Sequence, residues 1–262
     1  MKRKAITKVA LTVAGSDSGG GAGIQADLKT FCAHGVFGTS AITCITAQNP
    51  DRVSAMQVVT RRMVSEQMDR VFEAFHVGGA KTGMLYDAAI IETVADGFAR
   101  RKSAKLVIDP VMVASSGTLL LKKNAIAALT TALFPLAAVV TPNLAEAEVL
   151  ARRSIRSLEE LRATARLLAE KYGVPFLVKG GHLRGAKQVV DVLFDGSRFY
   201  EFRAARVPNI KTHGTGCTFS AAITANLALG RALPDSIAQA KRFVTSAIRN
   251  SLNVGRHTAL GI

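Results

Sequence analysis

The chain has 262 residues, of which 48% are hydrophobic and 20% charged, with a formal net charge of +15 and a pI of about 10.2. This composition is typical of a globular protein with one large core and argues against a disordered or fibrous chain. The basic balance favours anionic ligands or nucleic acid as partners. However, the Lys and Arg residues stand in short scattered groups, and the chain has no Trp and only 3 Tyr. We therefore expect most of this charge to lie on a solvated face.

In chain order, apolar runs bounded by turn residues predict strands over 9–14, 36–47, 53–60, 80–85, 105–108, 137–140 and 175–179. Helical periodicity and stop signals predict helices over 24–34, 64–75, 87–101, 122–133, 144–152, 158–171, 216–229 and 234–251. A hairpin is predicted over 189–193 and 198–202, turned by Asp195-Gly196. Strands alternate with helices without repeats or linkers, so we expect one α/β domain over 1–262 with a mostly parallel central sheet.

The three cysteines, Cys32, Cys44 and Cys217, are widely spaced and form no C-x-x-C pair. Their odd number argues against a disulfide framework, and their spacing argues against a zinc site. No apolar run reaches the roughly 18 residues that a membrane span needs. The apolar run near the start is too short for a signal peptide and has no convincing cleavage site. We expect a reduced, cytoplasmic protein with no membrane partner.

The glycine-rich loop over 15–23 matches neither common nucleotide-binding motif. Its glycines do not fit the G-x-G-x-x-G spacing, and no Lys-Ser/Thr pair follows Gly20 as a P-loop requires. The loop can still approach a ligand through its backbone. Its alternative role is a flexible turn between a strand and a helix.

The stretch Thr212-His213-Gly214-Thr215-Gly216-Cys217-Thr218 reads as a tight turn that opens into a helix. Backbone N–H groups in a first helical turn lack helical partners and carry the positive end of the helix dipole. A glycine-rich turn there lets an anion approach closely, which predicts a phosphate cradle. In the same position Cys217 is expected to have a lowered thiol pKa. The alternative is a plain helix start with a small buried residue.

Polar residues also follow the predicted strands. Asp109, Asn143 and Glu146 bring oxygen atoms to neighbouring strand ends, which suits Mg²⁺ held largely through water. Lys179 precedes Gly180-Gly181 and suits phosphate oxygens. Helix capping is an equal alternative for the asparagine and the glutamate. Together with the turn before Cys217, these groups make the set that phosphoryl transfer needs.

Seven segments in this order resemble the hydroxymethylpyrimidine/phosphomethylpyrimidine kinase family of thiamine synthesis, which has a ribokinase-like fold. The segments are 14–30 (AGSDSGGGAGIQADLKT), 46–49 (TAQN), 81–85 (KTGML), 109–112 (DPVM), 141–147 (TPNLAEA), 179–182 (KGGH) and 213–218 (HGTGCT). The resemblance covers about residues 9 to 255. It implies a ribokinase-like three-layer α/β/α sandwich with a mostly parallel central sheet.

The resemblance further implies ATP- and Mg²⁺-dependent phosphorylation of 4-amino-5-hydroxymethyl-2-methylpyrimidine, and then of its monophosphate, to the diphosphate. The expected partners are this small aminopyrimidine and ATP, with no nucleic acid, in a homodimer.

The resemblance also assigns roles to individual residues. The catalytic set is Cys217 with an anion hole at Gly214, Thr215 and Gly216. The substrate set is Gly15, Asp27, Gln48 and Met84. The nucleotide set is Asn143, Lys179, Thr212 and His213, and the magnesium set is Asp109 and Glu146. Cys217 would act as the base or as a polar group that positions the acceptor hydroxyl.

The amide of Gln48 can both donate and accept, which complements an aminopyrimidine edge, and Met84 offers an adaptable apolar wall. The alternatives are a loop amide that bonds its own backbone and an ordinary core residue. The family usually carries a terminal Val-Gly-Lys, whereas this chain has Val254-Gly255-Arg256, so a terminal phosphate contact would fall to Arg256.

Two other functions remain open at this point. A pyridoxal or pyridoxine kinase of the same fold is the first, and Gln48 discriminates because pyridoxal lacks the exocyclic amine. The second is a non-catalytic protein that binds anions or nucleic acid, which only the net charge suggests.

Overall fold

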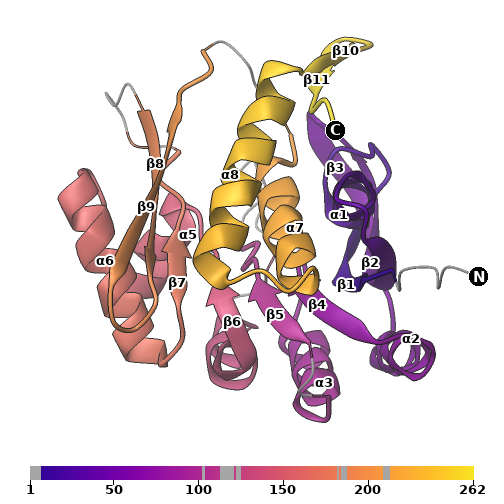
Figure 1. The fold of residues 1–262 in the computed structure, drawn as a ribbon. Coiled ribbons are helices and arrows are strands. Elements are labelled where there is room, and N and C mark those ends of the chain that lie inside the picture. Colours follow the sequence, from indigo (N-terminus) through magenta and orange to yellow (C-terminus); the bar gives the residue numbers. More distant parts are fainter. Residues whose placement is uncertain are drawn as a thin grey trace, which may run out of the picture.

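The computed structural model describes residues 7–101, 104–112, 121, 125–181, 183, 188–208 and 213–262. Nine strands form one sheet in the order β3-β2-β1-β4-β5-β6-β7-β8-β9 (Figure 1). These strands are β1 (Val9–Asp17), β2 (Phe37–Asn49), β3 (Arg52–Val58), β4 (Val77–Thr82), β5 (Lys105–Ile108), β6 (Ala137–Val140), β7 (Phe176–Val178), β8 (Gln188–Phe194) and β9 (Phe199–Ala205). A separate antiparallel hairpin joins β10 (Leu252–Val254) and β11 (His257–Ala259).

The middle of the sheet is parallel and its two edges are antiparallel. Strands β2, β1, β4, β5, β6 and β7 all pair in parallel. β3 pairs antiparallel with β2 across a short turn, and β8 and β9 form an antiparallel hairpin beside β7. The predicted mostly parallel sheet and the hairpin over 189–202 are therefore confirmed.

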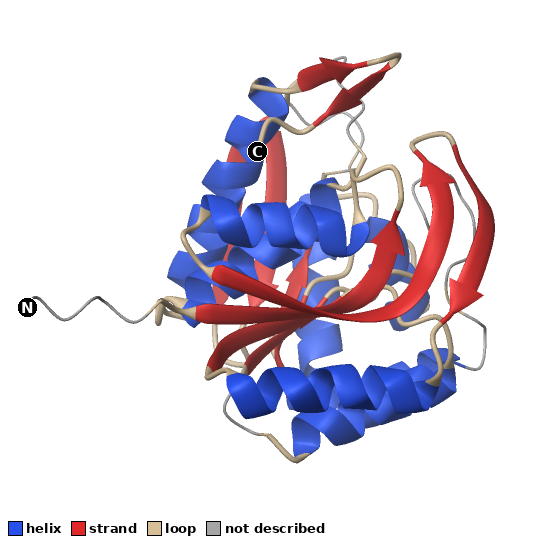
Figure 2. Ribbon diagram, turned by 90° about the vertical axis from the view of Figure 1, so that its right-hand side faces the viewer, coloured by secondary structure: helices blue, strands red, loops and turns tan. Residues whose placement is uncertain are grey.

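Helices cover both faces of the sheet (Figures 1 and 2). One face carries α1 (Gly23–Ala33), α7 (Thr215–Ala228) and α8 (Leu233–Arg249), which enclose two apolar clusters. The other face carries α2 (Arg61–Ala74), α3 (Ala88–Ala99), α4 (Ala125–Ala128), α5 (Leu144–Ala151) and α6 (Leu158–Tyr172) over the largest cluster. None of the helices described is long and apolar enough to cross a membrane.

The central strands read as unbroken apolar runs because both sides of the sheet are buried. Val107 and Val139 pack under α7 and α8, whereas their neighbours Ile108 and Val140 belong to the cluster on the opposite face. All four side chains are fully buried. This alternation fixes which polar residue at each strand end points towards α7.

Three elements differ from the sequence-based expectation. The strand expected over 80–85 runs instead from Val77 to Thr82. Its first half contains glycine, which does not predict a strand. The glycine is needed for close packing against α7, since an added Cβ on Gly79 would lie 2.7 Å from Thr224 O. The helix expected over 122–133 is α-helical only in α4, followed by a π-helical turn over Leu129–Leu133; residues 122–124 lie outside the described part. The β10–β11 hairpin was not expected, since its strands lack a buried apolar face.

Candidate active site

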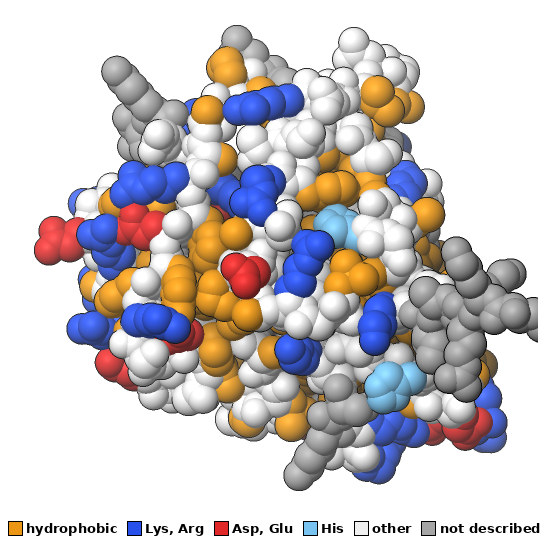
Figure 3. Space-filling model, in the orientation of Figure 1, with side chains coloured by type: hydrophobic (Ala, Val, Ile, Leu, Met, Phe, Trp, Pro, Cys, Tyr) orange, Lys and Arg blue, Asp and Glu red, His pale blue; other side chains and the backbone are white. Residues whose placement is uncertain are grey.

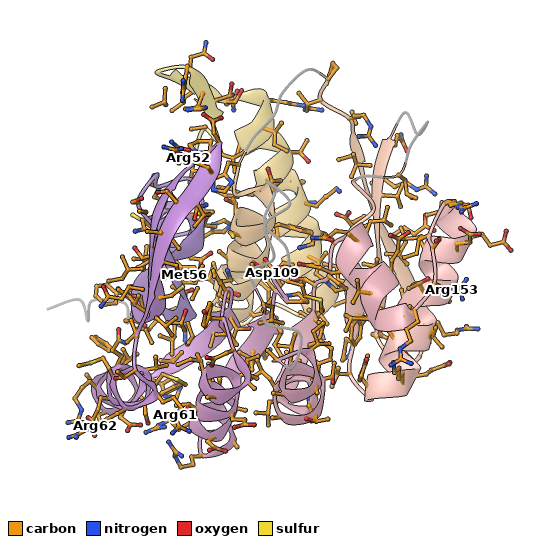
Figure 4. All side chains as sticks on the ribbon, turned by 180° about the vertical axis from the view of Figure 1, so that it is seen from behind. Arg52, Met56, Arg61, Arg62, Asp109 and Arg153 are labelled. Carbon is orange, nitrogen blue, oxygen red and sulfur yellow. The ribbon has the colours of Figure 1, made fainter. Side chains whose placement is uncertain are left out.

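Polar side chains meet where the parallel strands end beside the start of α7. Asp109 directly follows β5 and lies near the middle of the molecule (Figure 4). Asn143 follows β6 and Lys179 follows β7, and an isolated bridge pairs these two residues. Ligands of open α/β sheets bind at this edge, because residues distant in the chain converge there.

The turn that leads into α7 is built around Gly214, whose φ is +82°. An added Cβ there would overlap the carbonyl oxygen of Gly21, so the close approach of the two loops requires glycine. An added Cβ on Gly216 would lie 3.5 Å from Lys179 Nζ and 3.9 Å from Asp109 Oδ2. The first turn of α7 therefore faces an ammonium group, and its N–H groups together with that cation can hold an anion.

We call Lys179, Asp109, Glu146 and Ser220 the Lys179 cluster. Lys179 Nζ donates to Asp109 Oδ1 at 3.1 Å, and Ser220 Oγ donates to Asp109 Oδ2 at 3.2 Å. The side chains of Lys179 and Asp109 are 14% and 5% exposed. Burial lowers the pKa of Lys179, but the carboxylates of Asp109 and Glu146 outweigh it and raise the pKa above its ordinary value. The ammonium group consequently keeps its charge at the edge of the site.

Glu146 and Asn143 cap α5 reciprocally, as their alternative role predicted. Asn143 Oδ1 accepts from Glu146 N at 3.0 Å, and Glu146 Oε2 accepts from Asn143 N at 2.8 Å. Glu146 Oε1 also accepts from Met112 N at 3.1 Å. Burial raises the pKa of Glu146, Lys179 opposes the rise and Asp109 adds to it. Capping thus holds the glutamate side chain beside the other charges of the cluster.

The Lys179 cluster does not provide enough ligands for a metal ion held by the protein alone. It suits Mg²⁺ that binds together with phosphates. Within the described residues, no group of three or more His, Cys, Asp or Glu side chains is arranged to hold a metal ion. Mg²⁺ usually needs one or two protein carboxylates, because waters and phosphate oxygens complete its octahedron. Asp109 and Glu146 supply two buried carboxylates at one place.

Cys217 lies in the first turn of α7, close to the start of α1 at Gly23. Burial raises the pKa of the Cys217 thiol to about 11, and the Asp27 and Asp109 carboxylates add to the rise. The Lys81 ammonium and the Gly23 N–H act in the opposite direction. The expectation of a lowered pKa was therefore wrong: loss of hydration outweighs the helix terminus.

Thr12, Asp27 and Lys81, which we call the Lys81 cluster, are fully buried. Lys81 Nζ donates to Asp27 Oδ1 at 2.8 Å, and Thr12 Oγ1 donates to Asp27 Oδ2 at 2.6 Å. Burial raises the pKa of Asp27, although Lys81 and Thr12 oppose the rise. Both carboxylate oxygens are engaged inside the protein, so the position of Asp27 does not support the direct substrate contact expected of it.

Gly15 near the end of β1, Cys44 in β2 and Met84 after β4 form a compact wall. An added Cβ on Gly15 would lie 2.7 Å from Cys44 Sγ and 3.7 Å from Met84 Cβ. Cys44 is fully buried and its sulfur lies 3.8 Å from Met84 Sδ. Side chains fill the space behind this backbone, so any residue larger than glycine would have to displace them.

Gln48 is held at both ends of its amide. Its Nε2 lies 3.1 Å from His213 Nε2, and its Oε1 accepts from Thr46 Oγ1 at 3.1 Å. His213 Nε2 also lies 3.1 Å from Asp17 Oδ2. Asp17 in turn accepts from the backbone N–H groups of the glycine loop. The chain from Asp17 to Gln48 therefore links the loop after β1, the end of β2 and the turn before α7.

Some expectations fall elsewhere in the molecule. Thr212 lies outside the described residues. Arg256 donates to Asp51 Oδ2 at 3.0 Å, in the turn between β2 and β3, with both side chains more than half exposed. This pairing places the terminal arginine at the β2–β3 turn and gives no support to a phosphate contact.

Lys81, Asp17 and Ser220 also contact residues of the candidate site, and none of them was expected there from the sequence. A signal for the first was available, because a lysine inside an apolar strand must find a buried partner. Asp17 lies inside the segment 14–30 and Ser220 follows the segment 213–218, and only the tertiary contacts distinguish the two from ordinary loop and helix residues.

The model of the family described as phosphomethylpyrimidine kinase matches residues 17–260. The chain belongs to the phosphomethylpyrimidine kinase family. A hydroxymethylpyrimidine/phosphomethylpyrimidine kinase of Rhizobium meliloti is 49% identical over 244 residues, which cover 93% of this chain and 91% of that protein. The resemblance found in the sequence motifs is therefore confirmed.

Two solved structures are also similar. The phosphomethylpyrimidine kinase of Clostridium difficile has a TM-score of 0.82 at 38% identity, covering 92% of this chain and all of that chain. The ADP complex of Bacillus subtilis pyridoxal kinase has a TM-score of 0.88 at 35% identity, covering 97% and 98% of the two chains. These similarities confirm the ribokinase-like fold for this member of the phosphomethylpyrimidine kinase family.

Proposed function

We propose that this protein transfers the γ-phosphoryl group of MgATP to 4-amino-5-hydroxymethyl-2-methylpyrimidine, and then to the monophosphate, for thiamine biosynthesis. Membership of the phosphomethylpyrimidine kinase family supports the reaction class. The structural observation that carries the proposal is the meeting of Lys179, Asp109 and the first turn of α7 around Gly216. Phosphoryl transfer depends on such positioning and charge stabilisation rather than on covalent chemistry.

In the nucleotide half of the site, the N–H groups of Gly214, Thr215 and Gly216 and the Lys179 ammonium bind the transferred phosphate. Asn143 and Thr212 contribute to nucleotide binding, and His213 does so from the side of the site where it also contacts Gln48. Asp109 and Glu146 hold Mg²⁺ through water, and the metal neutralises charge on the phosphate oxygens when it is bound.

In the acceptor half, Gln48 reads the aminopyrimidine edge, and Gly15 and Met84 line the ring. Cys217 contacts the acceptor hydroxyl. Its thiol positions that oxygen, and its thiolate accepts the proton as the oxygen bonds to the γ-phosphorus and the bond to ADP breaks. With a pKa of about 11, only about one molecule in 10⁴ carries the thiolate at pH 7. The turnover number kcat should therefore rise with pH between about 7 and 9.

The decisive test is an MgATP turnover assay with hydroxymethylpyrimidine, its monophosphate and pyridoxal measured side by side. We expect turnover of both pyrimidines at higher kcat/KM than pyridoxal. Turnover of pyridoxal alone would overturn the substrate assignment and leave the kinase assignment intact. Omission of Mg²⁺ should abolish turnover, and rescue by Mn²⁺ would support a metal held by oxygen ligands.

A pyridoxal kinase is the second candidate, because solved pyridoxal kinases share the fold at 32–35% identity. The amide of Gln48 favours the pyrimidine, since pyridoxal has no exocyclic amine to donate a hydrogen bond to the amide oxygen. Direct competition between the two substrates would rank them in one experiment.

The net charge alone suggests nucleic-acid binding. Lys and Arg side chains are spread over the face that carries α8, with apolar and acidic groups between them (Figure 3). Arg61 and Arg62 lie on α2, far from Arg153 at the other end of the molecule (Figure 4). A dispersed pattern suits a solvated surface better than a binding stripe. A gel shift at physiological salt without kinase turnover would favour the nucleic-acid function.

We further propose that residues 1–262 form one kinase domain, that two copies form a homodimer and that the protein works in the cytoplasm. The nine-stranded sheet, which takes in all the described strands except β10 and β11, supports the first point. Sedimentation equilibrium would test the second, and fractionation of cells that express a tagged chain would test the third.

A further inference from the structure

Asp17 uses both oxygens of its carboxylate as acceptors. Gly19 N donates to Oδ1 and Ala22 N donates to Oδ2, each at 2.8 Å. Oδ2 also lies 3.1 Å from His213 Nε2, and the Asp17 side chain is only 3% exposed. An ionised carboxylate accepts hydrogen bonds and cannot donate one. His213 Nε2 must therefore carry a hydrogen, whether the ring is neutral or charged.

Thr46 makes the complementary demand at the other end of the Gln48 amide. Thr46 Oγ1 has one hydrogen, and the shorter of its two contacts donates that hydrogen to Ser16 O at 2.8 Å. In its 3.1 Å contact with Gln48, the amide consequently has to be the donor. With the amide oriented as described above, its N–H group faces the N–H of His213 instead. Rotating the amide by 180° about the Cγ–Cδ bond exchanges its oxygen and nitrogen and satisfies both neighbours.

We propose that Asp17 and His213 are positioning residues that determine substrate specificity, because they fix which way the amide of Gln48 points. The amide oxygen faces His213, and the amide nitrogen faces Thr46. His213 Nε2 lies 3.1 Å from both Asp17 Oδ2 and the amide, as expected for one hydrogen shared between two acceptors. The recognition of substrate in this inference rests on the proposed function, whereas the direction of the amide does not.

The glycine loop holds the backbone of Gln48 as well as the ring that faces its amide. Ser18 Oγ donates to Gln48 O at 2.8 Å, and Gln48 N donates to Ser18 Oγ at 2.8 Å. The His213 ring packs on Gly21, where an added Cβ would lie 2.9 Å from Cδ2 of the ring. The loop therefore positions the amide from two sides.

A fixed amide reads one order of donors and acceptors. After the bonds to His213 and Thr46, the amide of Gln48 has one lone pair left on its oxygen and one hydrogen left on its nitrogen. An aminopyrimidine offers the matching edge, with an exocyclic amine that donates beside a ring nitrogen that accepts. The 4-oxo analogue of the same pyrimidine has the reverse order, a carbonyl beside a ring N–H. We expect the fixed amide to accept the first edge and reject the second.

The test measures kcat/KM for 4-amino-5-hydroxymethyl-2-methylpyrimidine and for its 4-oxo analogue at saturating MgATP. Wild type should prefer the amine by at least about 100-fold, because the oxo edge opposes both ends of the amide. His213→Phe keeps a ring against Gly21 and removes the hydrogen, and Thr46→Val removes the hydroxyl. Each should reduce the preference by about 5- to 30-fold. The double variant should reduce it further, because its amide is free to rotate.

A gain with the oxo analogue separates this role from a merely structural one. A loosened site would lower kcat/KM for both substrates and leave their ratio near the wild-type value. A rotating amide should instead raise kcat/KM for the oxo analogue above that of wild type. A double variant that keeps the wild-type ratio would overturn the proposal.

Thr39→Val and His34→Phe are the matched controls. Thr39 Oγ1 donates to Ala10 O at 3.0 Å, which is the same kind of bond from β2 to a carbonyl of β1 that Thr46 makes. His34 ends α1 at the opposite terminus from the glycine loop. Both controls should keep the preference within about twofold of wild type.

Nitrogen-15 NMR of the histidine rings tests the role of Asp17 without any substrate. The signals of His213 are those that His213→Phe removes. We expect a hydrogen on Nε2 in wild type and a mixture of both neutral tautomers in Asp17→Ala, which should also lower the preference for the amine. A bare Nε2 in wild type, or the same tautomer in both proteins, would overturn the proposal. If Asp17→Ala does not fold by circular dichroism, the wild-type spectrum and the His213 and Thr46 variants carry the test.

The two readouts also distinguish this inference from the proposed function. Turnover of pyridoxal alone by a protein whose His213 Nε2 carries a hydrogen would refute the proposed function and leave the direction of the amide standing. Turnover of the aminopyrimidine with an unchanged preference in the double variant would do the reverse.

Discussion

Two buried lysine–aspartate pairs flank the start of α7, and they differ in how completely the protein encloses them. Lys81 and Asp27 are 0% exposed, and Thr12 occupies the remaining oxygen of the aspartate. Lys179 and Asp109 are 14% and 5% exposed and border the glycine turn. The first pair is closed within the protein, whereas the second pair meets the space where a phosphate group would bind.

This difference shows how one ion-pair chemistry can serve two purposes. A fully enclosed pair has paid its desolvation cost on folding and keeps a fixed field. A pair at the edge of a site can exchange partners with an incoming anion, because part of its surface remains accessible. Lys81 therefore suits a constant influence on Cys217, and Lys179 suits ligand binding.

The largest effect is expected at Cys217, which both pairs surround. Cys217→Ala should lower kcat about 10²- to 10⁴-fold if the sulfur accepts the proton. It should also remove the rise of kcat between pH 7 and 9. Steady-state turnover with saturating MgATP measures both, and Cys32→Ala, which changes an exposed cysteine, is the control. Turnover near the wild-type rate would sink the base role.

Lys179→Met should lower kcat/KM for MgATP about 10²- to 10³-fold, since it removes a cation aimed at the migrating phosphoryl group. Lys179→Arg should recover part of the loss because it keeps the charge. The comparison with Lys81→Met is the sharper measurement. Equal effects of the two variants on KM for MgATP would break the division between the closed pair and the open pair.

Gln48→Leu should reduce kcat/KM for the aminopyrimidine by roughly 5- to 150-fold, which corresponds to about 1–3 kcal/mol for an unpaired polar edge. Its effect on kcat/KM for pyridoxal should be smaller, so the measurement is the ratio of kcat/KM for the two substrates. Met84→Leu conserves volume and polarity and should leave this ratio nearly unchanged. If both variants alter the ratio alike, the amide does not read the ring.

Asp17 should contribute to stability against acid. Burial raises its pKa, but bonds from His213 and from the N–H groups of Ala22 and Gly19 outweigh this and hold the pKa below 3.8. A lowered native pKa gives stability that is present above pH 3.8 and is lost as the pH falls through the native value. In Asp17→Asn, the loss of unfolding free energy below pH 4 should be smaller by about 1 kcal/mol, as urea titrations at several pH values would show. An equal loss of unfolding free energy below pH 4 in Asp17→Asn and in wild type would contradict this.

The smallest effect is expected at Arg256, which pairs with Asp51 and with neither of the two lysine–aspartate pairs. Arg256→Ala removes an exposed contact with Asp51 and should cost less than about 1 kcal/mol of unfolding free energy. KM for MgATP should stay at the wild-type value. A several-fold rise in KM would restore the terminal phosphate contact that the sequence suggested.

Much of the fold could be predicted because its signals are local. The buried strand over 105–108 is a continuous apolar run, and the hairpin turn at Asp195-Gly196 carries its own turn chemistry. The strand at Val77–Thr82 was predicted three residues too late, because Gly78 and Gly79 do not favour a strand. Those glycines are explained by the approach of α7, which is a long-range contact and leaves no local pattern.

For the site, the sequence supplied residue types and strand-end positions, and it correctly raised capping for Asn143 and Glu146. It failed on the pKa of Cys217, because a helix terminus is visible in sequence and the depth of burial is not. It also gave no sign of the buried Lys81–Asp27 pair, since the two residues lie 54 positions apart.

The sequence alone determined the family, the alternation of strands and helices and the groups that could bind phosphate, because motifs, periodicity and glycine turns are encoded over short stretches. Only the tertiary structure decided which charges face each other. It enclosed Lys81 with Asp27, left Lys179 at the edge beside Asp109, and raised the pKa of Cys217. The reason is physical: burial and pairing depend on what packs across the sheet, and the strength of an electrostatic interaction depends on how much water remains around it.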